Sequence, residues 1–414
     1  MSGFATKALH GGGAGTPEAG GASTPLRTPV HDTVAFSFAG AAEIADAFAG
    51  RRPLHSYSRI SNPTVAELEG RVRDLTGSTG VVALASGMAA IANLILTLGG
   101  NGSNIVASRF LFGNTVSLLT HTLAPWGLES RFVDMTRPAE VAAAIDAGTR
   151  AIFLESITNP QLEVADLAAI SAVAKERGVP LILDNTAPTF YLCRGRELGV
   201  DVEIISSTKY ISGGGTAVGG LIIDHGLFDW SRSPRLASQA AKFGPFALLA
   251  TLRREINRNL GACLAPHAAY LHTLGLETLN LRIERSCATA LELAGVLQER
   301  PEVQAVNYPG LPQHPGHELA KRQFGGRYGG ILTFDLADQA RCFACIDRLR
   351  LIKRATNIND NKSLALHPAT TIFNEFSPRA QAEMGVRPTM IRLSVGLEDA
   401  ADLQDDLSQA LAGL

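Results

Sequence analysis

Short apolar runs that alternate with helical patterns constrain the fold of this chain more than any other feature. In the 414-residue sequence they begin near Gly80 and read VVALA, NIVAS, SRFVD, RAIFLE, PLILDN, VEIIS and VGGLIID. Runs that are apolar on both faces and joined by helices indicate strands of a mainly parallel sheet buried between helical layers. The sequence therefore predicts an α/β domain.

The pattern divides the chain into three parts. Residues 1–60 are rich in Gly, Pro, Ser and Thr and are expected to form an arm, in which His10 to Thr24 is too flexible for a core element. Residues 61–255 form the α/β domain. Residues 256–414 begin with a long helical pattern and continue with strands near GGILTFDL and MIRLSVG, which predicts a smaller C-terminal α+β domain.

The stretch from Val81 to Gly100 has twenty residues without a charge, a length that can span a membrane. Ser86 and Gly87 interrupt it, however, and Asn93 is polar. The stretch is therefore expected to form a buried strand that turns into a buried helix.

Charge and cysteine content exclude several classes of function. The net charge is −2 and no dense Lys/Arg block is present, so we expect no nucleic-acid or membrane partner. Five scattered cysteines make no disulfide framework, and no basic segment followed by an apolar one opens the sequence. These features favour a reducing cytoplasm. Cys342 and Cys345 form a single C-x-x-C pair and are predicted to be core thiols, with no metal site.

Polar residues follow several of the predicted strands. Asp184 and Lys209 fall at the carboxyl ends of two strands, where open α/β sheets bind their ligands. Ser86, Gly87 and Met88 lie where a strand becomes a helix, so that free backbone N–H groups can hold a phosphate there.

Lys209 lies in the segment SSTKYISGGG, between hydroxyl residues and glycines. A nucleotide-binding loop of the Walker type has its glycines before the lysine, so this arrangement disfavours a nucleoside triphosphate. Burial and nearby positive charge lower the pKa of an amine and make it a Schiff-base nucleophile. Pyridoxal phosphate requires such a lysine, an acid beside its ring nitrogen and donors for its phosphate. The residues that supply these groups are Lys209, Asp184, Gly87, Met88, Ser206 and Thr208.

Several segments together resemble the Cys/Met-metabolism family of pyridoxal-phosphate enzymes. They are YSRISNPT, ASGMAA, LDNT, SSTKYISGGG, SLALHPAT and RLSVGLED, and the resemblance covers nearly the whole chain. It implies the aspartate-aminotransferase-like fold (fold type I), with a large mixed, mainly parallel sheet domain and a smaller C-terminal domain. It also implies a homotetramer, built as a dimer of dimers with shared active sites.

The resemblance assigns a role to each matching residue. Lys209 binds the cofactor and shuttles protons, Asp184 pairs with the pyridinium nitrogen, and Arg392 grips the α-carboxylate of an amino-acid substrate. It places Gly87, Met88, Ser206 and Thr208 at the cofactor's phosphate. It places Tyr57 and Arg59 at the phosphate of the neighbouring subunit's cofactor, and it makes Tyr57 a catalytic residue as well. Asn159 is expected near the cofactor's 3′-oxygen, Phe112 stacked on the cofactor ring, and Asn357 at the substrate.

Within the family, the segments FGPFALLATLRREINRNLG and NINDNKSLALHPATT are most similar to the O-acetylhomoserine sulfhydrylase branch. Three departures from the wider family weaken a lyase interpretation: Phe112 replaces a tyrosine, Asn114 stands where methionine γ-lyases carry a cysteine, and Asn357 stands near the place where lyases tend to carry serine. The expected reaction is γ-replacement on O-acetylhomoserine by sulfide or methanethiol. Methionine or cystathionine γ-lyase, cystathionine γ-synthase and a pyridoxal-phosphate-binding regulatory protein without turnover are the alternatives. The sequence does not identify the acyl group of the homoserine substrate. Nor does it identify the sulfur donor, for which a protein-bound form is one of the alternatives.

Overall fold

The computed structural model describes residues 3–12, 25–52 and 54–414. Most of the predicted flexible stretch from His10 to Thr24 lies outside the described residues. Two helices precede the large domain, α1 (Phe4–His10) and α2 (Ala41–Ala49). No helix among the described residues has both the length and the apolar character needed to cross a membrane.

The large domain is built around a seven-stranded sheet in the order β1-β7-β6-β5-β4-β2-β3. Its strands are β1 (Gly80–Leu84), β2 (Ser103–Ser108), β3 (Leu128–Val133), β4 (Thr149–Glu155), β5 (Leu181–Asp184), β6 (Val202–Ile205) and β7 (Gly220–Asp224). All pairs from β3 to β6 are parallel, and β7 runs antiparallel to both of its neighbours. Each apolar run predicted as a strand forms one, which confirms the expected α/β architecture.

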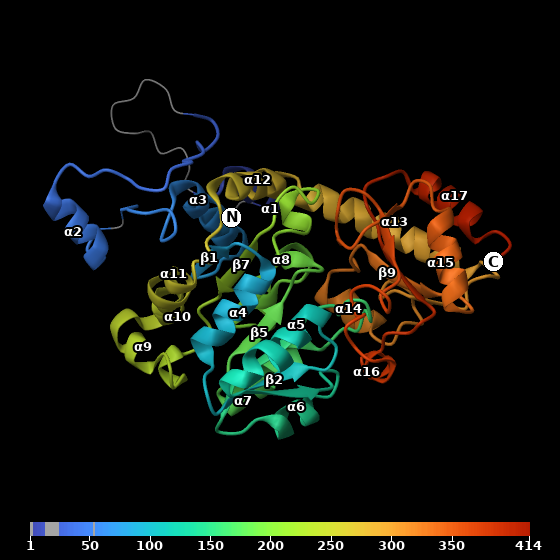
Figure 1. Ribbon diagram of the computed structural model, residues 1–414, viewed down its shortest axis with the longest axis horizontal. Helices are drawn as coiled ribbons and strands as arrows, with labels where there is room; N and C mark the ends of the chain where they lie inside the picture. Colours follow the sequence, from blue (N-terminus) through green and yellow to red (C-terminus); the bar gives the residue numbers. More distant parts are fainter. Residues whose placement is uncertain (1–2, 13–24, 53) are drawn as a thin grey trace.

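Helices cover both faces of this sheet (Figure 1). They are α3 (Pro63–Thr76), α4 (Gly87–Leu98), α5 (Gly113–Ser117), α6 (Pro138–Ala144), α7 (Leu167–Arg177), α8 (Thr189–Leu192), α9 (Ala237–Phe243), α10 (Ala247–Thr251), α11 (Asn257–Leu260) and α12 (Pro266–Glu277). Along β1, Val81 and Ala83 pack in the cluster that contains α3 and α7, whereas Val82 and Leu84 pack in the cluster that contains α4 and α10. This alternation follows from the period of two along a strand. The uncharged stretch from Val81 forms β1 and α4, as predicted.

The small domain begins with the long helix α13 (Leu279–Gln298) and contains a five-stranded sheet in the order β10-β11-β12-β9-β8. Its other elements are β8 (Ala305–Asn307), α14 (His317–Gln323), β9 (Ile331–Asp335), α15 (Gln339–Arg348), β10 (Lys353–Arg354), β11 (Leu364–Leu366), α16 (Pro378–Glu383), β12 (Met390–Ser394) and α17 (Ala400–Leu411). Cys342 and Cys345 lie buried in α15, as predicted for core thiols. The small domain, coloured orange to red, stands beside the large one in Figure 1.

The packing at the two ends of the large domain bears on the predicted domain limits. The boundary at 255/256 falls in a helical run that continues to Leu260, and α12 packs against α3 of the large domain. We therefore propose a boundary between α12 and α13 instead. At the other end, α1 packs against α3 and α12 with Ala8 fully buried, so this part of the predicted arm lies on the body of its own chain.

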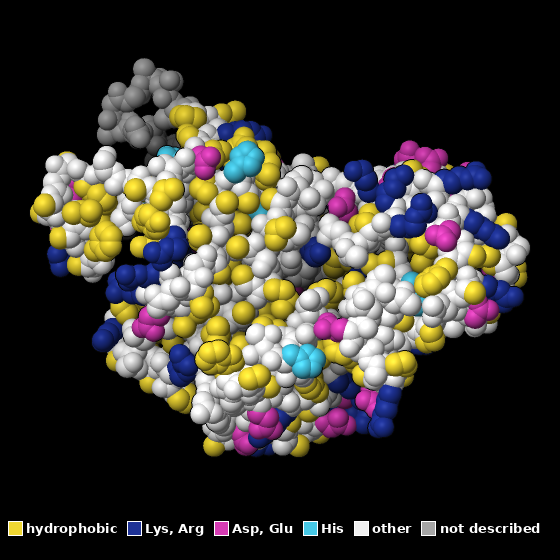
Figure 2. Space-filling view, in the orientation of Figure 1, with side chains coloured by type: hydrophobic (Ala, Val, Ile, Leu, Met, Phe, Trp, Pro, Cys, Tyr) yellow, Lys and Arg dark blue, Asp and Glu magenta, His cyan; other side chains and the backbone are white. Residues whose placement is uncertain are grey.

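Of the described residues 25–52 and 54–60, helix α2 projects from the body, while Arg27, Pro29 and His31 contact α3 and α12. Helix α2 has no buried residue, and Figure 1 shows it at the far end of the molecule from the small domain. Apolar side chains gather over this segment in Figure 2. The exposed ones include Val30, Val34, Ile44, Phe48 and Leu54. An apolar surface of this kind is typical of a protein contact.

Candidate active site

A cavity of about 220 Å³ lies at the carboxyl ends of the parallel strands, between the two domains. Strands β4 and β5 end side by side at Glu155 and Asp184, and β6 leads into Ser206. Nine of the predicted site residues line the cavity: Gly87, Met88, Phe112, Asn159, Asp184, Ser206, Thr208, Lys209 and Arg392. The fold thus brings together residues that are up to 305 positions apart in the sequence, Gly87 and Arg392 being the extremes.

One end of the cavity is built to hold an anion. Ser86 caps α4, because its hydroxyl accepts a hydrogen bond from the Ala89 N–H at 3.0 Å. The N–H groups of Gly87 and Met88 lie in the first turn, at the positive end of the helix dipole. A Cβ added at Gly87 would lie 2.7 Å from the Cβ of Ser206, so the two segments approach this closely only because residue 87 is glycine.

Lys209 lies on the loop after β6 with its amine inside the cavity. Its Nζ donates a hydrogen bond to Oδ1 of Asn357 at 2.7 Å. Burial, and then the charge of Arg392, lower the pKa of Lys209 to about 8, while Asp360 opposes this shift. A substantial fraction of the amine is therefore neutral near physiological pH, as a nucleophile or a proton acceptor requires.

The glycines after Lys209 explain how a small-domain residue reaches it. Gly214 and Gly215 have φ values of +126° and +66°, which L side chains rarely adopt. A Cβ at Gly214 would lie 2.6 Å from Nδ2 of Asn361, and one at Gly215 would lie 2.6 Å from Oδ2 of Asp360. The bare backbone lets the segment 356–361 dock on the lysine loop and carry Asn357 to the amine.

Asp184 faces the cavity at the end of β5. One of its carboxylate oxygens accepts a hydrogen bond from the Thr186 N–H at 3.1 Å. Burial raises the pKa of Asp184, and the hydroxyl and N–H of Thr186 oppose that rise. A buried carboxylate with free acceptor capacity is suited to hold a protonated ring nitrogen.

Arg392, on β12 of the small domain, closes the other end. Its two terminal nitrogens donate to Oδ1 of Asn159 and to the carbonyls of Thr356 and Asn357, each at 3.1 Å. Nε is buried and lacks a partner among the described residues. Burial lowers the pKa of Arg392 to about 9, so the guanidinium is still charged at neutral pH and can bind an incoming carboxylate.

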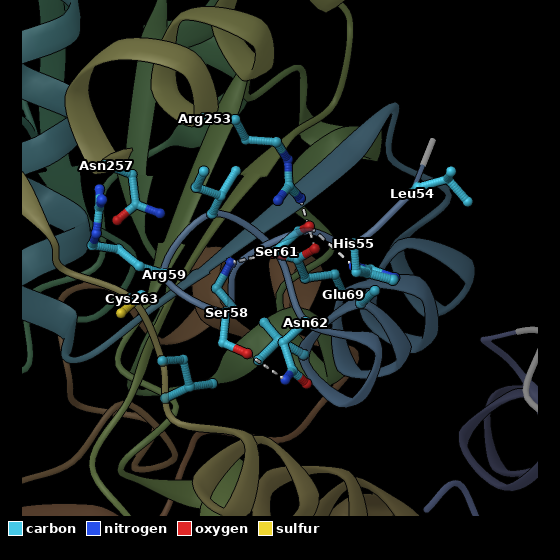
Figure 3. Close-up of a pocket in the computed structure, with 15 residues that line it drawn as sticks. Leu54, His55, Ser58, Arg59, Ser61, Asn62, Glu69, Arg253, Asn257 and Cys263 are labelled. Atoms are coloured by element: carbon cyan, nitrogen blue, oxygen red, sulfur yellow. Dashed lines mark hydrogen bonds and ion pairs between the residues drawn. The ribbon is translucent and has the colours of Figure 1, made fainter. Parts of the chain in front are cut away.

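Tyr57 and Arg59 lie apart from this cavity. Arg59 lines a second cavity of about 310 Å³ at the start of α3 (Figure 3). Its guanidinium donates to the Arg258 carbonyl, and the neighbouring Glu69 and Arg253 form an ion pair at 2.6 Å. Tyr57 is 38% exposed. Neither residue lines the Lys209 cavity of its own chain.

Sequence reasoning missed three residues of the site. Glu155 and Thr186 line the cavity, and Asp360 accepts a hydrogen bond from Nδ2 of Asn357 at 3.1 Å. A signal for Glu155 was present, since it closes the apolar run RAIFLE just as Asp184 closes PLILD. The roles of all the predicted site residues stay predictions.

Comparisons with known proteins agree with this geometry. The model of the Cys/Met metabolism PLP-dependent enzyme family matches residues 5–412. The chain is 40% identical to O-acetyl-L-homoserine sulfhydrylase 1 of Thermus thermophilus, over 99% of this chain and 100% of that protein. It is 38% identical to L-methionine gamma-lyase of Pseudomonas putida, over 99% and 98% of the two chains.

A solved structure of a related protein has the same fold as this chain. A Campylobacter jejuni protein assigned as an O-acetylhomoserine (thiol)-lyase superposes with a TM-score of 0.94 at 33% identity, over 99% of this chain and 100% of that one. That protein carries a pyridoxyl-lysine phosphate. The amine of Lys209, the carboxylate of Asp184 and the donors around Gly87 fit such a group at its aldehyde, ring nitrogen and phosphate. The chain belongs to the Cys/Met metabolism family of PLP-dependent enzymes.

Proposed function

We propose that this enzyme replaces the acetate of O-acetylhomoserine with sulfide or methanethiol, releasing homocysteine or methionine. The observation that carries the proposal is that Lys209 and Phe112 line the same cavity. Lys209 supplies an amine for proton transfer, and Phe112 supplies an aromatic face without a hydroxyl. Acetate departs without being protonated, whereas a thiolate leaving group gains from an acid. The cavity therefore favours substrates with an acyl leaving group.

The side chains divide the work of this reaction. Bound pyridoxal phosphate supplies a protonated ring that accepts electron density from the substrate's α- and β-carbons. The Lys209 amine, held by Asn357, takes the α-proton, and Asp184 stabilises the positive charge of the ring. Arg392 binds the α-carboxylate and so presents the Cα–H bond to Lys209. Phe112 would hold the cofactor ring through its π-face.

A product assay with the wild-type enzyme tests the proposal. With O-acetylhomoserine and sulfide we expect homocysteine as the main product. The missing acid at Phe112 is worth about 10²–10⁴-fold, so kcat/KM for cleavage of methionine to a 2-oxo acid should be lower by roughly that factor. Parallel reactions with methanethiol and cysteine, and with acetyl-, succinyl- and phosphohomoserine, identify the sulfur donor and the acyl group.

The other outcomes of the assay point to the alternatives. A 2-oxo acid formed without added thiol at a comparable rate would contradict the proposal and identify a γ-lyase. Preferred formation of cystathionine from cysteine would identify a cystathionine γ-synthase. A protein that binds the cofactor but exchanges no α-proton with any amino acid would be a regulatory relative.

We also propose that the enzyme is a cytoplasmic homotetramer, a dimer of dimers whose sites are shared within each dimer. Tyr57 and Arg59 do not line the Lys209 cavity of their own chain, and the segment that carries them also exposes the apolar side chains of Val30, Val34 and Leu54. In the assembly, Arg59 would reach the cofactor phosphate of the partner. All five cysteines are free and four of them are buried, which is in keeping with a reducing compartment.

Mixing two inactive variants tests the shared site. Arg59→Ala and Lys209→Ala should each be inactive, yet random exchange of their chains should restore about a quarter of the wild-type activity, because half of the dimers are hybrids with one intact site of two. Chain exchange is verified by mass spectrometry of differently tagged chains. Exchanged chains that stay inactive would show that Arg59 serves its own chain.

A further inference from the structure

Glu155, the last residue of β4, holds two backbone groups at once. One carboxylate oxygen accepts a hydrogen bond from the Phe112 N–H at 2.6 Å, and the other accepts one from the Asn159 N–H at 3.2 Å. Phe112 is the N-cap residue of α5, at the end of the loop after β2, and Asn159 belongs to the loop after β4. The side chain thus links two loops that are otherwise separate in the sequence.

A carboxyl group in this position is costly. Glu155 is 7% exposed and stands beside Asp184, its register partner on β5. Burial and the charge of Asp184 raise the pKa of Glu155 well above its usual value, and the two N–H donors oppose the rise. An amide would avoid the repulsion, but the two N–H groups point at different oxygens, so its NH2 group would face one of these donors and one hydrogen bond would be lost. The two hydrogen bonds are what a carboxyl group alone provides here.

The contacts of Glu155 continue into the substrate pocket. Oδ1 of Asn159 accepts a hydrogen bond from Arg392 at 3.1 Å, and the other Arg392 bonds go to backbone carbonyls. The orientation of Asn159 therefore decides where the guanidinium points. Phe112, on the other side of Glu155, lines the cavity together with Asp184 and Lys209.

We propose that Glu155 is a positioning residue that aligns the cofactor ring, through Phe112, with the substrate carboxylate, through Asn159 and Arg392. A single side chain thereby sets the geometry of both partners of the reaction. The proposal rests on the cofactor and carboxylate sites used in the proposed function, but it holds for replacement and elimination alike, because both begin at the same Cα–H bond.

The variant Glu155→Gln separates this role from a general loss of structure. It keeps the size of the side chain but removes one acceptor and the charge. We expect the dissociation constant of pyridoxal phosphate from the apoenzyme to rise roughly tenfold to a hundredfold, the range for one hydrogen bond to a charged group. The dissociation constant of L-norleucine, which has a carboxylate but no leaving group, should rise in the holoenzyme as well. Binding is followed by the visible circular dichroism of the cofactor.

A double-mutant cycle tests the route through Asn159. In an Asn159→Ala background, Glu155→Gln should add little to the loss of norleucine affinity, while it should still weaken cofactor binding through Phe112. The control is Glu163→Gln, which changes a half-buried carboxyl on the same β4–α7 connection, away from the cavity, and should leave both constants unchanged.

Two results would overturn the proposal: unchanged constants in Glu155→Gln, or fully additive effects with Asn159→Ala on norleucine binding. If Glu155→Gln does not fold, Glu155→Asp is measured in the same way, since the shorter side chain keeps the charge but cannot span both N–H groups. Neither readout depends on which product forms, so a failure of the proposed function in the product assay would be distinct from a failure here.

Discussion

Replacing Lys209 with alanine is expected to abolish turnover and the visible absorption of the holoenzyme. In the proposed function, this amine is both the covalent attachment point of the cofactor and the base that moves the α-proton. Proton transfer alone is worth about 10²–10⁴-fold, and loss of the attachment adds to it. The pKa of about 8 leaves this amine partly neutral at physiological pH, which a typical surface lysine is not. Absorption spectra and initial rates measure both effects.

Lys321→Ala provides the matched control. Lys321 is exposed on α14, so its loss should change neither the spectrum nor the rate. Adding a primary amine such as ethylamine should restore part of the activity of Lys209→Ala, because a free amine can replace the missing base. A yellow and fully active Lys209→Ala enzyme would remove Lys209 from the mechanism.

Arg392→Leu is expected to lower kcat/KM for O-acetylhomoserine by roughly 30-fold to several thousandfold, which corresponds to the 2–5 kcal/mol typical for one partner of a buried charge pair. The change should appear mainly in KM, because the guanidinium binds the carboxylate before and during the reaction. Arg392→Lys keeps the positive charge but loses the bidentate geometry of the guanidinium, so its kcat/KM should lie between those of the wild type and Arg392→Leu.

A decarboxylated substrate analogue supplies the control for Arg392. It lacks the group that Arg392 binds, so the wild-type enzyme and Arg392→Leu should process it equally poorly. If Arg392→Leu kept the wild-type KM for O-acetylhomoserine, another residue would have to bind the carboxylate.

The sheet of the large domain could be predicted from sequence because its strands are buried on both faces. Such strands appear as short apolar runs, and their carboxyl ends mark where ligands bind. Asp184 and Lys209 could be found for this reason. Glu155 occupies an equivalent strand end but was overlooked, because a single acidic residue after a strand is usually a solvated one.

Contacts between distant segments could not be predicted in this way. Asn159 and Arg392 are 233 positions apart, and Lys209 and Asn357 are 148 apart. Periodicity reports which face of an element is buried, and it does not report which loop meets which across a domain boundary. For Arg392 and Asn357, only the family resemblance pointed to the site.

The division of the cavity between two domains bears on how such enzymes diversify. The phosphate cradle, Asp184 and Lys209 belong to the large domain, whereas Arg392 and the segment 356–361 belong to the small one. Mutations in the small domain can therefore change how the substrate carboxylate is bound, while the large-domain residues proposed for the cofactor stay unchanged. Relatives named as a sulfhydrylase and as a γ-lyase match this chain almost equally well over their whole length. A scaffold that holds the cofactor residues in one half and the carboxylate-binding arginine in the other allows the two kinds of contact to change separately.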